Sequence, residues 1–212
     1  MRRIALVTHP ESQHHVEQKV GGWYDTDLTE RGQQQAKAIA MVLAAELPLA
    51  SPIYSSDLQR TAQTAALIAH SLHSQVVLDQ RLREMSYGAA EGRDQAWFDQ
   101  QIVYPPQAEG RLDHRVYPSS ENRREVASRI YAAMDTIINS AAQQLVIVTH
   151  GFAASFVIAA WLGMPIEALG SVAFQVNSGN ISWLTQSAPF HNRTLYQLND
   201  TRHLSNLYGD YA

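Results

Sequence analysis

The chain has 212 residues, enough for one compact domain with a sizeable core. Its 16 basic and 20 acidic residues give a formal net charge of -4, which argues against a nucleic-acid-binding protein that acts through a global positive field. The absence of cysteine excludes disulfides, thiol catalysis and cysteine-ligated metals.

The sequence also offers no obvious membrane segment. The longest apolar stretch, Phe152–Leu162, is too short to span a bilayer. The brief apolar run after Met1–Arg3 lacks the length of a secretory signal. We therefore expect a soluble cytoplasmic protein without a membrane or nucleic-acid partner.

Strands and helices alternate in the first part of the chain. Ile4–Thr8 is a continuous apolar run, typical of a buried parallel strand. Apolar spacing predicts a helix over Glu30–Glu46, capped by the preceding threonine. Pro52–Ser55 is predicted to be a short strand, and Ser56 or Asp57 to cap the helix that follows.

Residues 86–119 are the least regular part of the sequence. They contain several glycines, prolines and aromatic residues, with one predicted helix around Gln95–Gln101. We interpret this segment as an insert that covers one end of the sheet, within a single domain that spans residues 1–212.

Regular elements return after the insert. Ser119 or Ser120 is predicted to begin a long helix whose buried side runs from Val126 to Ala141. Leu145–Thr149 has the pattern of a second buried strand.

The last part combines a buried helix with further strands. Phe152–Leu162 is apolar on all sides, as a buried helix is, and Gly163 predicts its end. Val172–Val176 and Ile181–Thr185 have β patterns. The alternation predicts a three-layer α/β/α sandwich, with helices on both faces of a mostly parallel central sheet.

Three candidate residues converge at one edge of this sheet. Ligands of such sheets bind beyond the carboxyl ends of the strands, where His9 and His150 follow two predicted strands. Arg60 falls in the first turn of a helix, whose free backbone N–H groups favour an anion. An imidazole can attack phosphorus and a guanidinium matches phosphate oxygens, so the residues themselves indicate a phosphate site.

Five segments in order resemble the histidine phosphatase superfamily, the phosphoglycerate-mutase-like proteins. They are LVTHPES (family form LVRHGES), GGWYDTDLTERGQQQA, IYSSDLQRTAQTA, LREMSYGAAEG and IVTHGF. The resemblance extends from Ile4 to about Leu184, nearly the whole chain. It implies a phosphoglycerate-mutase-like fold, a small phosphorylated substrate, and neither a cofactor nor a metal.

The resemblance also implies a role for individual residues. His9 matches the nucleophile that becomes phosphohistidine, and Glu84 matches the general acid that protonates the leaving oxygen. Arg60 matches a phosphate-binding arginine, and His150 the histidine that stabilises the transferring phosphoryl group. Phosphoryl transfer depends mainly on positioning and on cations around the phosphoryl oxygens, which agrees with these roles.

Three positions depart from the family pattern. Thr8 replaces an arginine, Pro10 replaces a glycine and His15 replaces an asparagine. Loss of one donor from such a site can cost about 3–4 kcal/mol of transition-state stabilisation. Thr8 and His15 are nevertheless kept as expected phosphate-binding residues, and the Pro10 carbonyl is expected to orient the His9 ring.

The sequence does not determine which residue supplies the positive charge of the arginine that Thr8 replaces. His14 and His15, if protonated beside a phosphate, would restore positive charge, although both also fit exposed loop positions. Four arginines offer further alternatives, namely Arg83, Arg115, Arg123 and Arg124.

The leading hypothesis is a phosphomonoester hydrolase with an altered phosphate pocket. A catalytically weak or inactive pseudophosphatase, serving as a binding or regulatory domain, is the main alternative because of Thr8. A phosphoglycerate mutase is a lesser alternative. The mutases that the chain resembles carry an adjacent arginine pair before a proline run in the insert, and no such pair precedes Tyr104-Pro105-Pro106 here. A metal site formed by His9, His14, His15 and Glu84 is disfavoured because Arg60 would repel the cation.

Substrate identity and oligomeric state are not fixed by the sequence. Several aromatic residues fall in the expected loop and insert, where they suit either an apolar leaving group or a small core of the insert, namely Trp23, Tyr24, Tyr87, Trp97, Tyr104 and Tyr117. Small α/β domains often form two-fold dimers, so a homodimer is an open alternative to a monomer.

Overall fold

A computed structural model describes residues 1–105 and 110–207 of the chain. Its central sheet has six strands in the order β3-β2-β4-β1-β5-β6. Four of them are parallel: β1 (Arg2–Thr8), β2 (Ile53–Ser55), β3 (Val76–Leu78) and β4 (Gln144–Thr149). The antiparallel strands β5 (Ile181–Gln186) and β6 (Arg193–Asp200) complete one side.

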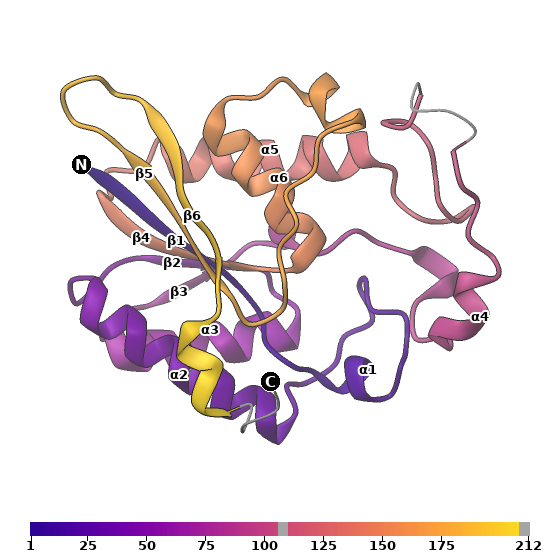
Figure 1. The fold of residues 1–212 in the computed structure, drawn as a ribbon, viewed down its shortest axis with the longest axis horizontal. Coiled ribbons are helices and arrows are strands. Elements are labelled where there is room, and N and C mark those ends of the chain that lie inside the picture. Colours follow the sequence, from indigo (N-terminus) through magenta and orange to yellow (C-terminus); the bar gives the residue numbers. More distant parts are fainter. Residues whose placement is uncertain (106–109, 208–212) are drawn as a thin grey trace.

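Helices cover both faces of the sheet (Figure 1). Helices α2 (Glu30–Glu46) and α3 (Gln59–Leu72) pack together on one face, and α5 (Arg123–Ile138) and α6 (Gly151–Leu162) on the other. The predicted three-layer sandwich with a mostly parallel sheet is therefore confirmed.

Strand β1 contributes side chains to the hydrophobic cores on both faces of the sheet. Ile4 and Leu6 belong to the hydrophobic core under α5 and α6, whereas Ala5 and Val7 belong to the core under α2 and α3. All four side chains are fully buried, which is why the strand reads as an uninterrupted apolar run.

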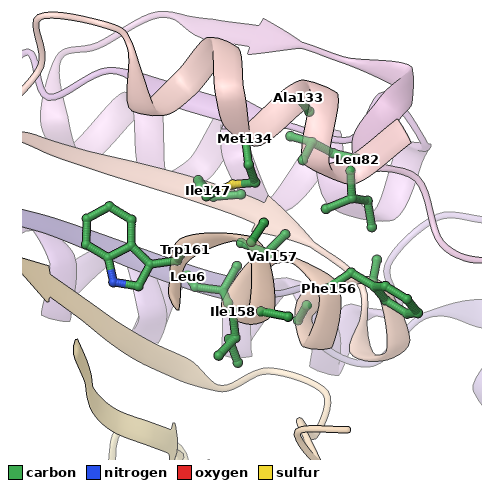
Figure 2. Close-up of a cluster of buried hydrophobic side chains, with 14 of the residues drawn as sticks. Leu6, Leu82, Ala133, Met134, Ile147, Phe156, Val157, Ile158 and Trp161 are labelled. Carbon is green, nitrogen blue, oxygen red and sulfur yellow. The ribbon is translucent and has the colours of Figure 1, made fainter. Parts of the chain in front are cut away.

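Helix α6 is buried between the sheet and α5. Figure 2 shows Val157 and Ile158 of this helix among Leu6, Ile147 and Met134, which come from β1, β4 and α5. Because neighbours surround the helix, apolar residues are favoured on every side of it. Gly163 ends it with a φ of 71°, the left-handed conformation that glycine adopts easily, as predicted.

Two helix starts differ from the prediction. The N-cap of α3 is Leu58, not Ser56 or Asp57. The N-cap of α5 is Asn122, whose side chain accepts the N–H of Glu125 at 2.9 Å while the Glu125 carboxylate accepts the N–H of Asn122. This capping box starts α5 later than the predicted Ser119 or Ser120.

Other elements also differ from the prediction. Residues 172–176 form no strand, α5 ends at Ile138, and Ala141 is exposed. Strands β3 and β6 were not predicted. β3 has only three residues, and β6 lies at the edge of the sheet with mixed exposed and half-buried residues, so neither carries a long apolar run.

The described parts of the predicted insert, residues 86–105 and 110–119, lie beyond the carboxyl ends of the parallel strands (Figure 1), and its residues 106–109 fall outside the described ranges. It contains α4 (Gln95–Asp99), shorter than the predicted Gln95–Gln101, and short η2 (Gly88–Ala90). Figure 1 places α4 on the same side of the sheet edge as α1 (Gln13–Val16). Phe98 packs with Val20 and Ala90 in a small core of this region.

No helix in the described ranges is both long and apolar enough to cross a membrane.

Candidate active site

His9 follows β1 directly, and its ring is fixed in one tautomer. Nδ1 lies 2.8 Å from the carbonyl oxygen of Pro10, and Nε2 lies 3.2 Å from Nε of Arg60. A carbonyl can only accept and a guanidinium can only donate, so the proton sits on Nδ1 and the lone pair on Nε2. Pro10 thus orients the ring through its carbonyl, as expected, and the lone pair of Nε2 accepts the hydrogen bond from Arg60.

Arg60 is a fixed cation beside that lone pair. Its Nη1 donates to the carbonyl of Tyr24 at 2.9 Å and its Nη2 to the carbonyl of Gly22 at 2.6 Å. The side chain is only 1% exposed, and burial lowers its pKa to about 10. Arg60 therefore stays protonated near neutral pH, with its orientation set by main-chain acceptors.

Two backbone N–H groups at the start of α3 already have local acceptors. The backbone N–H of Gln59 donates to the Asp25 carboxylate at 2.7 Å, and that of Leu58 to the Ser56 hydroxyl at 3.4 Å. Local acceptors already satisfy these groups. The residue of α3 that lines the cavity is Arg60.

His150 lies against His9 at the end of β4. The two ring centroids are 5.1 Å apart, with an angle of 68° between the planes. Nε2 of His150 is 2.9 Å from the hydroxyl of Ser56, whereas Nδ1 is buried without a hydrogen-bond partner among the described residues. Burial, and then the positive charge of Arg60, lower the His150 pKa well below its ordinary value.

Glu84 is held by the N-terminus of α6. Its carboxylate accepts backbone N–H groups from Met85 at 2.8 Å and from Phe152 and Ala153 at 3.0 Å. Burial nevertheless raises the pKa of this carboxyl, and these hydrogen bonds oppose the shift only in part. Arg129 fixes the same turn by donating to the Glu84 carbonyl at 2.7 Å.

A polar cavity of about 250 Å³ connects these residues. His9, Arg60 and Glu84 line it together with His15, whereas the fully buried His150 lies behind His9. The rest of the lining comes from α1, α4 and the neighbouring loops, and consists of His14, Lys19, Val20, Gly21, Gly22, Tyr87, Gln95 and Phe98.

His14 and His15 form one wall of the cavity. The His15 ring stacks on His9 with centroids 5.5 Å apart, and the rings of His14 and His15 are 4.1 Å apart. Burial lowers the pKa of His14 to about 3 and also lowers that of His15. Both imidazoles are therefore neutral near pH 7 in this state, and His14 is buried, not an exposed loop residue.

Thr8, like the fully buried His150, is a predicted phosphate contact that does not line the cavity. Its hydroxyl donates to the carbonyl of Asn177 at 2.5 Å and accepts from Nδ2 of Asn180 at 2.7 Å. The side chain is fully buried. Thr8 thus ties β1 to the loop before β5, and the structure brings the other predicted residues together without it.

The arginines considered as substitutes are engaged elsewhere. Arg83 pairs with Asp57 at 2.6 Å, Arg115 with Glu125 at 2.6 Å, and Arg124 with Asp113 at 2.6 Å. Arg123 lines a second, more apolar pocket.

Lys19 is a cavity residue that the sequence analysis missed. Its ammonium lies 2.6 Å from a carboxylate oxygen of Asp94, at the rim of the cavity. It is one of only two lysines in the chain, and its position two residues before the GGWYD motif was the available signal.

Within residues 1–105 and 110–207, no group of three or more histidine, aspartate or glutamate side chains is arranged to hold a metal ion. Arg60 also places a positive charge at the centre of the candidate cluster.

Comparison with known proteins agrees with this geometry. Residues 4–200 match the histidine phosphatase superfamily (branch 1). The chain is 33% identical over 168 residues to the probable phosphoglycerate mutase GpmB of Escherichia coli K12, which covers 78% of this chain and 77% of the relative.

Solved structures of phosphatases have the same fold. A mycobacterial glucosyl-3-phosphoglycerate phosphatase complexed with VO3 has a TM-score of 0.78 and 25% identity, covering 95% of this chain and 100% of that one. The α-ribazole phosphatase of Shigella flexneri has a TM-score of 0.76 and 26% identity, covering 93% of this chain and 96% of that one. With its six-stranded sheet and its paired histidines, this chain belongs to the histidine phosphatase superfamily.

Proposed function

We propose that this protein hydrolyses phosphomonoesters through a phosphohistidine at His9. The observation that carries the proposal is the lone pair on His9 Nε2, held beside the Arg60 cation by the Pro10 carbonyl. A neutral, oriented imidazole next to a fixed guanidinium joins a nucleophile to a phosphate ligand.

The first half-reaction transfers the phosphoryl group. Nε2 of His9 attacks phosphorus, the bond from phosphorus to the ester oxygen breaks, and Glu84 gives its proton to that oxygen as the alcohol leaves. In the second half-reaction water attacks phosphorus while the Glu84 carboxylate accepts its proton. The products are inorganic phosphate and free His9, so the cycle is balanced.

The environment of Glu84 suits both steps. Burial raises its pKa, which favours a carboxyl that holds its proton closer to neutral pH. The three N–H groups from Met85, Phe152 and Ala153 stabilise the carboxylate after the proton has left. These opposing effects suit an acid that must also act as a base.

His150 and His15 are proposed to contact the transferring phosphoryl group. Nδ1 of His150 is buried without a partner in the described part of the chain, and a phosphoryl oxygen would provide one. His15 stacks on His9 at the position where the family pattern has asparagine. A dianionic phosphate would favour a proton on His15, restoring part of the charge of the missing arginine.

Mutase chemistry requires the phosphoenzyme to survive until the phosphoryl group is returned to a substrate. The similarity to a probable phosphoglycerate mutase makes this the second candidate. We favour hydrolysis because the structural relatives named as phosphatases cover nearly the whole chain.

The test is hydrolysis of 4-nitrophenyl phosphate by the intact protein and by His9→Ala, with release of inorganic phosphate measured directly. We expect hydrolysis by the wild type and none above background by the variant. Equal rates for the two proteins would contradict the proposal and favour the pseudophosphatase. Interconversion of 2- and 3-phosphoglycerate without net phosphate release would favour the mutase.

A further inference from the structure

A second pocket adjoins the candidate active site. Its volume is about 730 Å³, and most of its lining is apolar or aromatic. The walls come from the segment after Glu84, the insert and the first turns of α5 and α6, with Met85, Tyr87, Val116, Arg123 and Phe152 among them.

The two cavities meet at the proposed general acid. Tyr87 lines both of them. Met85 and Phe152, whose backbone N–H groups hold the Glu84 carboxylate, line the larger pocket, while Glu84 itself lines the smaller one. A leaving oxygen that receives a proton from Glu84 therefore lies at the junction, and the rest of the leaving group has the larger pocket in front of it.

Arg123 is a buried cation in this pocket. It is 9% exposed, and its guanidinium lies 5.2 Å from the Phe152 ring centroid. Its Nε and Nη2 donate to the carbonyls of Leu169 and Val172, at 2.6 and 3.1 Å. In the described part of the chain it pairs with no carboxylate, in contrast to its neighbour Arg124.

A second arginine and a histidine share the pocket. Arg111 lines it and forms no ion pair with any described residue, and its charge lowers the pKa of Arg123 further after burial has done so. Nε2 of His114 donates to the carbonyl of Val103 at 2.6 Å, which leaves Nδ1 of that ring as an acceptor. No aspartate or glutamate is among the described lining residues.

No carboxylate of the described residues offsets the charge of Arg123, and a buried cation is costly unless an anion completes its site. A neutral apolar ligand would fill the volume but leave Arg123 unpaired. A small anion alone would pair with Arg123 but leave the aromatic walls without contacts. The two features together fit a ligand with an apolar body and an acidic group.

We propose that the preferred substrates are phosphomonoesters whose leaving group has an apolar, ring-sized body and a carboxylate that pairs with Arg123 and Arg111. This inference rests on the proposed hydrolase function. It deepens that function by naming the class of leaving group.

The test compares two esters that differ only in charge, 4-carboxyphenyl phosphate and 4-carbamoylphenyl phosphate. The carboxamide is a neutral group of similar shape and is also electron-withdrawing. We expect kcat/KM to be at least about tenfold higher for the carboxylate, the factor that corresponds to one favourable charged contact.

Variants assign the preference to residues. Arg111→Gln changes an exposed side chain and should reduce the preference for the carboxylate ester severalfold. Arg123→Gln should reduce it further. Arg115→Gln is the matched control, because Arg115 is in the same insert but pairs with Glu125 and does not line the pocket.

Binding without turnover separates this inference from the proposed function. The 4-carboxybenzyl and 4-carbamoylbenzyl phosphonates cannot be hydrolysed, and their dissociation constants are measured by calorimetry. Tighter binding of the carboxylate, lost in Arg111→Gln, supports the pocket even if no ester is hydrolysed. Equal affinities for the two phosphonates, or an equal loss in Arg115→Gln, overturn the inference even if His9-dependent hydrolysis is found.

Discussion

Nε of Arg60 donates a hydrogen bond to Nε2 of His9 across 3.2 Å. The guanidinium thus occupies the lone pair of the proposed nucleophile and opposes its protonation. Burial lowers the pKa of His9 well below its ordinary value, and Arg60 lowers it further. A bound phosphate would accept the Arg60 N–H in place of His9, which frees the nucleophile when the substrate arrives.

The first prediction concerns Arg60 itself. Arg60→Ala should weaken binding of vanadate severely and lower kcat by about a hundredfold or more, as expected for loss of a preorganised charged donor. Inhibition by vanadate measures the binding. Arg60→Lys keeps the charge but loses the fork of donors, so it should retain only part of the vanadate affinity and of kcat.

Arg60 is also a structural residue, because it donates to the carbonyls of Gly22 and Tyr24. Circular dichroism should show that each variant is folded at the assay temperature. Arg202→Ala, which changes an exposed arginine paired with Asp200, serves as the control. A folded Arg60→Ala protein with wild-type vanadate affinity would remove Arg60 from the site.

The second prediction concerns His15 and pH. Burial lowers its pKa in this structure, so it is neutral near pH 7, whereas a bound dianion favours its protonated form. Binding then takes up a proton, and affinity for a phosphonate inhibitor should rise as pH falls from 8 toward 6. His15→Asn, the residue of the family pattern, should flatten this dependence. A pH profile that is the same in both proteins contradicts the role of His15.

The third prediction concerns Glu84 as an acid. Glu84→Gln should lower kcat by about 10²–10⁴-fold for alkyl phosphates, whose leaving oxygen needs a proton. The loss should be much smaller for 4-nitrophenyl phosphate, whose leaving group is stable as an anion. The ratio of the two losses is the measurement, and equal losses would mean that Glu84 acts by position and not by proton transfer.

The fourth prediction concerns Thr8. Its fully buried hydroxyl contacts Asn177 and Asn180, and neither of these groups can neutralise the charge of the family arginine. Thr8→Arg should destabilise the fold by several kcal/mol, as a buried unpaired charge does, and should not raise activity. Thr8→Val removes only the hydroxyl and should cost about 1–3 kcal/mol. Thermal unfolding measures both, and a stable, more active Thr8→Arg protein would be contrary to this account.

The fifth prediction follows from the buried neutral imidazoles. The pKa of His14 is about 3 in the folded protein, below its usual value, so the unfolded state binds a proton first as pH falls. The stability that His14 contributes is present above about pH 6.5 and is lost below it, by up to about 1.4 kcal/mol per pH unit. His14→Gln should reduce this slope in urea unfolding, and His70→Gln, at an exposed position, should leave it unchanged. An unchanged slope in His14→Gln would refute the assignment.

Much of the fold follows from patterns that the sequence displays. The run from Ile4 to Thr8 and the all-apolar helix over Phe152–Leu162 are specified by burial on every side, and both were predicted within two residues at each end. Helix α2 was predicted with its bounds because Thr29 caps it and its buried positions repeat regularly. The short β3 and the half-exposed β6 have too few buried apolar residues to be predicted from the sequence.

The site was predictable where a motif fixed it. His9, His150, Arg60 and Glu84 meet because three strand ends and one helix start share an edge. Contacts between distant segments were not predictable from the sequence, such as the Asp25 carboxylate on the α3 N-terminus, the Ser56 hydroxyl on His150, and the pairing of Thr8 with Asn180.

The central claim is that His9 carries the phosphoryl group. The most direct measurement is mass spectrometry of peptides after rapid quench of the enzyme with substrate, under alkaline conditions that preserve phosphohistidine. We predict one phosphoryl group on the peptide that contains His9, absent in His9→Ala and accumulating in Glu84→Gln with an aryl phosphate. Phosphate release with no phosphoryl group on His9, undiminished in His9→Ala, would contradict the account.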